Sequence, residues 1–215
     1  MAAGSARGDA GTASRILDIA EELVQARGFN GFSYADIAAE VGISKAALHY
    51  HFPGKADLGL ALITRYADRF GESLAAIDRT DATPADRIAE YTRLYDQVLR
   101  QDKMCLCGML AAEYQTLPAP MRAAVAGFFE DNENWLEKVL EDGRHDASLR
   151  FTGTARETAR MVIACLEGAM LVARPSGDSD RVRSVAENLI ADLTARRRAR
   201  VGQPPPPRTG AGTGR

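Results

Sequence analysis

The sequence predicts an all-α protein in which a small N-terminal domain of three helices is followed by a larger helical bundle. Three observations favour this class. Apolar residues recur at helical spacing along most of the chain, no segment alternates with the period of a strand, and caps, prolines and glycines divide the pattern into separate helices. With 215 residues, of which 46% are hydrophobic, the chain can bury a small domain and a larger one.

The N-terminal helices begin after a polar segment. Residues 1–11 have no apolar core of their own, so we expect a disordered arm there. A first helix is predicted over 12–27, because Ile16, Ile19 and Leu23 share one face and Gly28 supplies a stop.

The stretch 32–58 predicts two short helices joined by a tight turn and followed by the start of a third. Ser33 and Asp36 form a capping box at the start of the first helix, and Gly42 ends it where a left-handed residue is tolerated. Ser44 caps the second helix, and Leu48 faces inward from it. This arrangement is typical of a helix-turn-helix, whose second helix enters the major groove of DNA.

Two short helices can also meet at a glycine without binding DNA. The outer face of the second helix favours the DNA interpretation, since it carries Lys45, His49, Tyr50 and His51 rather than a mixture of Glu and Lys. Lys55 follows Pro53-Gly54 at the start of the next helix, where backbone N–H groups and a cation can meet a phosphate.

The stretch GFSYADIAAEVGISKAALHYHFPGKADL, with the helix that ends at Gly28, resembles the N-terminal domain of the TetR (TetR/AcrR) family of transcriptional regulators. It covers about the first quarter of the chain. Two positions depart from the commonest pattern: Ala46 stands where Gly is frequent, and His49 stands where a phosphate-binding Tyr is frequent, with Tyr50 next to it able to take that role. The resemblance implies a repressor that binds double-stranded operator DNA and leaves it when a small-molecule inducer binds.

The expected DNA contacts lie in and beside the two short helices. Phosphate contacts are assigned to Ser33, Ser44, Tyr50 and Lys55, and base-edge contacts to Lys45, Ala46, His49 and His51. Lys45 suits guanine acceptors, and Ala46 can touch a thymine methyl group. A reader of this kind needs two-fold symmetry to reach successive major grooves, so we expect a homodimer.

The charge of the N-terminal part is unusual for such a domain. Residues 1–60 contain five Lys and Arg against seven Asp and Glu, a net charge of −2, whereas DNA-binding domains are usually basic. We therefore expect Asp18, Glu21, Glu22 and Glu40 to lie away from the face of Lys45, and the non-specific affinity for DNA to be modest.

The rest of the chain predicts further helices. They are expected from Gly54 through Ile77, from the Thr83-Pro84 cap to Leu99, over 102–115, over 121–141, from the Thr154/Glu157 capping box to near Pro175, and over 179–197. A loop is expected over 143–153. We accordingly divide the chain into the arm, a DNA-binding domain at 12–57, a ligand-binding and dimerisation domain at 58–200, and a disordered tail at 201–215 that begins near four consecutive prolines.

The resemblance implies a small-molecule pocket in the second domain and pairing of its last two helices with a second subunit. The candidate pocket residues are polar, aromatic or sulfur-containing side chains at inward spacing: Tyr91, Tyr95, Cys105, Met109, Glu113, Phe128, Trp135, Met161 and Cys165. The alternative is that most of them simply fill the core. In the last two helices Ala164, Gly168 and Ala169 allow close approach of another helix.

The cysteines leave a second function open. Residues two apart on a helix point about 200° from each other, so Cys105 and Cys107 do not share a metal there, and we expect no metal and no cofactor. Both are either small apolar fillers or redox or electrophile sensors, with Lys103 close enough in sequence to lower the pKa of Cys105.

Other classes have less support. The three histidines, His49, His51 and His145, form no catalytic motif, so we expect that the protein is not an enzyme. The alternative is a helical enzyme or carrier that keeps a DNA-binding domain without using it. With no disulfide framework, secretory signal or long uncharged apolar run, we expect a cytoplasmic protein without a membrane partner.

Overall fold

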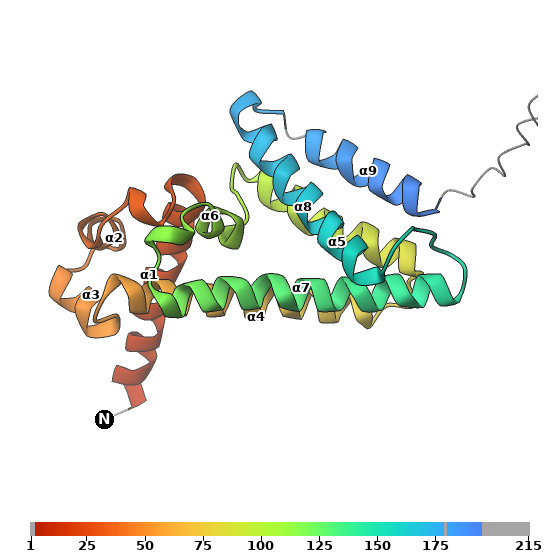
Figure 1. Cartoon of the computed structure of the whole chain (residues 1–215). Coiled ribbons are helices and arrows are strands. Elements are labelled where there is room, and N and C mark those ends of the chain that lie inside the picture. The colour runs from red at the N-terminus through yellow and green to blue at the C-terminus, as the bar shows by residue number, and fades with distance from the viewer. Residues whose placement is uncertain (1–2, 179, 195–215) are drawn as a thin grey trace, which may run out of the picture.

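The computed structural model describes residues 3–178 and 180–194. This part of the chain is helical and contains no strand, which confirms the predicted class (Figure 1). The N-terminal domain contains α1 (Ala3–Arg27), the 3-10 turn η1 (Phe29–Gly31), α2 (Tyr34–Val41) and α3 (Lys45–His51). The expected tail at 201–215 lies outside the described residues.

The helix α1 starts earlier than the sequence indicated. It runs from Ala3, whereas we expected a disordered arm to residue 11 and a helix from Thr12. The predicted start was wrong because a lack of apolar residues does not by itself stop a helix, and residues 3–11 contain no proline, although they have as many glycines as alanines. The face of α1 that packs against the rest of the N-terminal domain begins further along the helix. It contains Ile16, Ala20 and Val24, which are fully buried.

A long helix, α4 (Lys55–Asp78), leaves the N-terminal domain and runs the length of the bundle (Figure 1). The bundle is completed by α5 (Pro84–Arg100), α6 (Leu106–Ala112), α7 (Ala119–His145), α8 (Ala155–Ala173) and α9 (Asp180–Thr194). Helix α7 packs along α4, α5 and α8, and α9 covers α5 and α8. The short α6 lies between α1, α4 and α7, so it meets the N-terminal domain, as α4 also does through α1.

The helix α6 is shorter than predicted. We expected a helix over 102–115 with both Cys105 and Cys107 inside it. Instead Asp102 has a left-handed φ of 58°, Cys105 is the N-cap, and the helix ends at Ala112 before a 3-10 turn over Tyr114–Thr116 (η2). The thiol of Cys105 accepts a hydrogen bond from the backbone N–H of Gly108 over 3.4 Å, so a sulfur replaces the usual capping oxygen.

The end of α7 also differs. A loop was expected from Gly143, but α7 continues to His145. Leu149 folds back onto Gly143 so closely that a Cβ at that position would overlap its side chain. The glycine therefore serves close packing inside a helix and does not break it. No helix in the described part of the chain is long and apolar enough to cross a membrane.

Candidate nucleic-acid interface

The turn between α2 and α3 has the geometry that its caps predicted. Ser33 N–H donates to Asp36 Oδ2 over 2.7 Å, and Ala35 N–H donates to Ser33 Oγ over 3.2 Å, which closes the capping box. Gly42 is left-handed (φ 77°, ψ 36°), and its N–H donates to Ala38 O over 3.0 Å. The hydrogen bonds that Asp36 accepts from the Ser33 hydroxyl and backbone lower its pKa, so this cap is ionised at neutral pH.

The outer face of α3 is the surface that could meet DNA. Lys45, Ala46, His49 and Tyr50 are exposed, with Tyr50 at 76%, and Leu48 on the opposite face is completely buried. The predicted base-reading and phosphate-contacting side chains of this helix therefore share one accessible surface, and His51 lies at its edge with its ring against that of Tyr50.

Ser44 is also exposed and caps α3 by accepting a hydrogen bond from Ala47 N–H over 3.1 Å. A serine hydroxyl can accept one hydrogen bond and donate another. The cap is therefore compatible with a second role as a donor to a phosphate oxygen. Ser33 is exposed too, but its hydroxyl donates to Asp36 Oδ2 over 2.8 Å, so this hydroxyl already has an acceptor.

Tyr34 holds the end of α3 in place and was missed by the sequence analysis. Its hydroxyl donates to Phe52 O over 3.0 Å, and its ring lies 4.8 Å from the ring of His49. His49 Nδ1 is in turn 3.0 Å from Pro53 O. Burial, with a smaller contribution from the charge of Asp57, raises the pKa of Tyr34 to about 12, so the hydroxyl keeps the proton that it donates. In the sequence, the signal for this role was the position of Tyr34 directly after the Ser33 cap.

Lys55, which was assigned to a phosphate, directs its ammonium group to contacts within the chain. Its Nζ donates to Phe29 O and Phe32 O, each over 2.5 Å, and lies 4.2 Å from the centroid of the Phe32 ring. Burial lowers its pKa, partly offset by the charges of Glu113 and Asp36. The backbone carbonyls of Phe29, in η1, and Phe32, after it, attract the ammonium group inward. These residues are too distant from Lys55 in sequence for a local pattern to reveal the contacts.

Three of the four acids expected away from the face of Lys45, those on α1, pair with basic side chains of the bundle or of the segment before α6, whereas Glu40 is exposed on α2. Asp18 and Glu21 pair with Arg65 of α4, and Glu21 also pairs with Arg69. Glu22 pairs with Lys103, which precedes α6. These carboxylates are therefore neutralised on the side of the domain that faces the bundle, which explains how a net acidic segment can present Lys45 without adjacent acids from α1.

The candidate pocket residues in the bundle divide into three groups. Tyr91, Tyr95, Cys105 and Phe128 are buried, and Trp135, Met109 and Cys165 are half-buried against the same core. The Tyr91 hydroxyl lies 3.1 Å from the hydroxyl of Tyr95 and donates to Asn132 Oδ1 over 3.1 Å. The ring of Tyr91 stacks on Trp135 at 5.6 Å.

Two candidates point elsewhere. Met161 was expected to face inward, but it is 48% exposed, because α8 turns its neighbours Val162 and Ile163 to the core. Glu113 was also expected inward. Its carboxylate instead accepts hydrogen bonds from the backbone N–H groups of Phe29 (2.6 Å) and Asn30 (3.4 Å), so it joins α6 to η1.

The two thiols near α6 are shielded from solvent. Cys105 and Cys107 are buried, and burial, followed by the charge of a nearby glutamate, Glu167, raises the pKa of both thiols. The expected influence of Lys103 on Cys105 is absent because Lys103 pairs with Glu22 instead. Among the described residues no three His, Cys, Asp or Glu side chains form a group that could hold a metal ion.

A capped helix-turn-helix with an exposed second helix, joined by a continuous helix to a helical bundle, defines a DNA-binding regulator. Comparison with protein families agrees. Residues 16–62 match the model for "Bacterial regulatory proteins, tetR family", and residues 84–188 match that for "Transcriptional regulator LmrA/YxaF-like, C-terminal domain". The chain belongs to the TetR family of transcriptional regulators, which confirms the resemblance seen in the sequence.

Individual relatives extend over most of the chain. The transcriptional regulator AcuR of Cereibacter sphaeroides is 32% identical over 158 residues, covering 71% of this chain and 72% of the relative. The repressor NemR of Escherichia coli is 26% identical over 190 residues, covering 84% and 94%. A TetR-family regulator from Agrobacterium tumefaciens has a similar structure, with a TM-score of 0.84, 33% identity, and coverage of 87% of this chain and 100% of that one. These relatives share both domains, so this chain is a transcriptional repressor of the family with a ligand-binding C-terminal domain.

Proposed function

We propose that the protein binds operator DNA as a homodimer through α3 and releases it when a small molecule separates α4 from the bundle. The observation that carries this proposal is the continuity of α4. Its first residue, Lys55, follows α3 closely, and further along the same helix Tyr66 and Phe70 lie in the aromatic interior of the bundle. A change among these rings therefore reaches the recognition helix through one rigid element.

The DNA contacts follow from the exposed surface of α3. Lys45 and His49 face base edges, and Ser44 and Tyr50 hold phosphates, with Ala46 near a thymine methyl group. His51 lies at the edge of this surface. Ser33 contributes indirectly, by capping α2. The boundary between the DNA-binding domain and the ligand-binding domain lies near residue 57, within α4.

A second copy of the chain would cover the exposed apolar stripe of α8. Met161, Leu171 and Val172 are 48%, 59% and 56% exposed, and the small residues Ala164 and Gly168 lie between them at helical spacing. Small residues let a partner helix approach closely, and the larger ones supply the apolar area that association needs. With α9 beside it, α8 forms the proposed dimer interface.

Release requires a ligand that prefers the DNA-incompetent conformation, because a ligand with equal affinity for both states shifts nothing. In the described structure the inner cavity beside Tyr66 and Phe70 measures only about 10 Å³. A ligand that occupies it must push α4 outward, and so changes the separation of the two α3 helices in the dimer.

The test is a gel shift with DNA from upstream of the protein's own gene, or with fragments selected from the genome, across a salt series. We expect one dimer-sized complex whose affinity falls steeply with salt. Lys45→Ala should weaken specific binding about 10- to 100-fold, the range for one base-reading side chain, whereas Lys138→Ala, an exposed lysine of α7, should change nothing. Equal affinities of wild type and Lys45→Ala for the selected DNA would contradict the assignment of α3.

A covalent signal at Cys105 is the second candidate. The observation in its favour is that the Tyr66 hydroxyl of α4 donates to Cys105 Sγ over 3.7 Å, so alkylation of this thiol would displace α4. NemR, whose reduced form has a known structure with a TM-score of 0.73 and 26% identity, is a relative. The raised pKa of both thiols disfavours the nucleophilic thiolate. Unaltered electrophile-induced DNA release in Cys105→Ser and Cys107→Ser variants would eliminate this candidate.

A further inference from the structure

Glu167, on α8, is a half-buried residue whose carboxyl group lies beside the start of α6. Its Oε2 lies against Gly108 at the start of α6, so closely that a Cβ at Gly108 would overlap it. Its Oε1 is buried and has no hydrogen-bond partner within the described part of the chain. No described Lys, Arg or His forms an ion pair with this carboxyl group.

This arrangement is unfavourable for the protein by itself. Burial of a carboxylate that has neither a cation nor a full set of hydrogen bonds carries a large desolvation penalty. Accordingly, burial raises the pKa of Glu167 to about 7, and the neighbouring Cys105 thiol offsets only part of this effect. A cation brought to the carboxyl group would remove the penalty.

The surroundings of Glu167 suit an organic cation. Its charge reaches the hydroxyl groups of Tyr66, Tyr91 and Tyr95, whose pKa values it helps to raise. The ring of Phe70 lies 6.4 Å from Tyr66, 6.0 Å from Tyr91 and 6.2 Å from Tyr95. Aromatic faces attract cations through their electron-rich surfaces, so one acid and several rings share the same interior.

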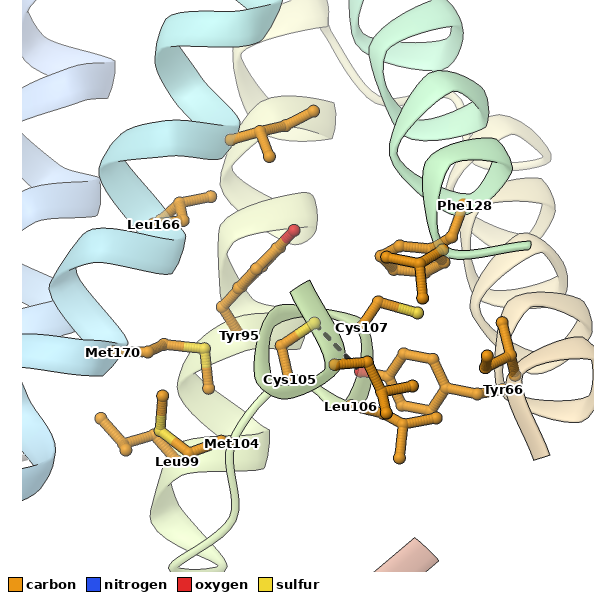
Figure 2. Packing of buried hydrophobic residues seen from close by; sticks show 14 of the residues in the cluster. Tyr66, Tyr95, Leu99, Met104, Cys105, Leu106, Cys107, Phe128, Leu166 and Met170 are labelled. Atoms are coloured by element: carbon orange, nitrogen blue, oxygen red, sulfur yellow. Dashed lines mark hydrogen bonds between the residues drawn. The ribbon is translucent and has the colours of Figure 1, made fainter. Parts of the chain in front are cut away.

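Figure 2 shows how this interior is arranged. Tyr95 from α5, Tyr66 from α4 and Met170 from α8 lie around Cys105, and Leu166 and Met170 belong to the same stretch of α8 as Glu167. These side chains come from four elements, so a group placed here would contact α4, α5, α8 and the start of α6 together.

We propose that the ligand of this regulator is an organic cation, with an ammonium group that pairs with Glu167 and an aromatic or aliphatic body that lies among Tyr66, Phe70 and Tyr95. This inference rests on the proposed ligand-induced release. A carboxylate ligand would be repelled by Glu167, and a neutral apolar one would leave the carboxyl group without its partner.

The cavities indicate how such a ligand would act. The inner cavity, beside Cys105 and Met170, measures about 10 Å³, which is room for about one water molecule. An outer groove of about 190 Å³ opens between α4 and α5, and the two spaces share Tyr66, Phe70, Leu94 and Val98 as walls. Glu167 lines neither space, so a cation that enters through this groove reaches it when these side chains move apart, and two of them belong to α4.

The outer groove does not itself repel a cation strongly. Arg69 at its rim is paired with Glu21 of α1, so its charge is compensated, and the remaining polar groups there, Ser73, Gln97 and Gln101, are neutral. The groove can therefore admit an ammonium group on its way to the interior.

The test uses the full-length protein and aromatic bodies of one, two and three rings, each carrying an ammonium, a hydroxyl or a carboxylate group on the same short arm. Binding is measured without DNA by calorimetry and by the fluorescence of Trp135, the sole tryptophan, which stacks on Tyr91. We expect at least one ammonium compound to bind tenfold or more tightly than its hydroxyl and carboxylate counterparts. Glu167→Gln should abolish this preference, and Glu130→Gln, an exposed acid on α7, should retain it.

The inference is overturned if no ammonium compound binds, if the neutral or acidic compounds bind as well as the ammonium ones, or if Glu167→Gln keeps the preference. A parallel gel shift separates this result from the proposed function. Cation binding that leaves the DNA complex intact supports the site but refutes ligand-induced release, whereas release by an acid or alcohol supports release and refutes the cation.

Discussion

The burial of Glu167 can be tested by stability alone, without DNA or ligand. Replacement by glutamine removes the ionisable group while keeping its size. Because the pKa is about 7 in the folded protein and near 4.5 ordinarily, the folded state binds the proton more tightly. Below the unfolded pKa near 4.5 the carboxyl group is protonated in both states and costs no stability. As the pH rises from there toward 7, the free energy of unfolding falls. Above that range the full penalty is present.

The magnitude follows from the size of the shift. A difference of roughly 2.5 pKa units corresponds to about 3 kcal/mol at 1.36 kcal/mol per unit. Most of this penalty is present at about pH 8, and under about 1 kcal/mol at about pH 5. Relative to wild type, Glu167→Gln should therefore gain about 2 kcal/mol more at pH 8 than at pH 5. The groups that surround the acid, Cys105 and the tyrosines of α4 and α5, have raised pKa values and do not titrate in this window.

Urea denaturation at one fixed protein concentration measures this difference, since the stability of a dimer depends on concentration. Glu130→Gln is the matched control, because that glutamate is exposed on α7 and its replacement should give the same stability change at both pH values. An equal effect of Glu167→Gln at pH 5 and pH 8 would show that the carboxyl group is hydrated in the folded protein, and would refute the reasoning.

Two further predictions concern the interfaces. Lys55→Ala should lower the free energy of unfolding by roughly 1–3 kcal/mol, the cost of leaving buried polar groups unpaired. It should leave the salt dependence of DNA binding unchanged, and a shallower salt slope would show that Lys55 contacts a phosphate. Leu171→Asp should convert the dimer to a monomer in analytical ultracentrifugation, with loss of the discrete gel-shift complex, because dimerisation would bury the aspartate within the α8 stripe. Leu60→Asp, at an exposed leucine of α4, is its control, and a dimeric Leu171→Asp variant would exclude this interface.

The features that the sequence predicted well are local ones. The Ser33/Asp36 and Thr154/Glu157 capping boxes and the left-handed Gly42 each depend on residues within one turn, so their patterns carry their geometry. Lys55 could not be placed in this way. Its position depends on the carbonyls of Phe29 and Phe32, which lie on another segment and approach it only after folding.

Glu167 was missed for a related reason. A single glutamate on an amphipathic helix is usually solvated, and nothing in the sequence marked this one as different. Its spacing from Ile163 and Met170, four residues after one and three before the other, was the only signal that it lies on the inner side of α8. Whether that side is covered depends on α6, whose start at Cys105 was itself not predictable from the pattern.

The connection between the bundle and the DNA-binding domain converges on one peptide segment. Glu113, at the end of α6, accepts a hydrogen bond from Phe29 N–H, while Lys55, at the start of α4, donates to Phe29 O. Deeper in the bundle the same two elements are joined by the Tyr66–Cys105 contact. A ligand that separates α4 from the start of α6 breaks this inner contact and alters the position of η1 from both sides. Such a ligand therefore differs in its affinity for the two conformations, as the proposed release requires.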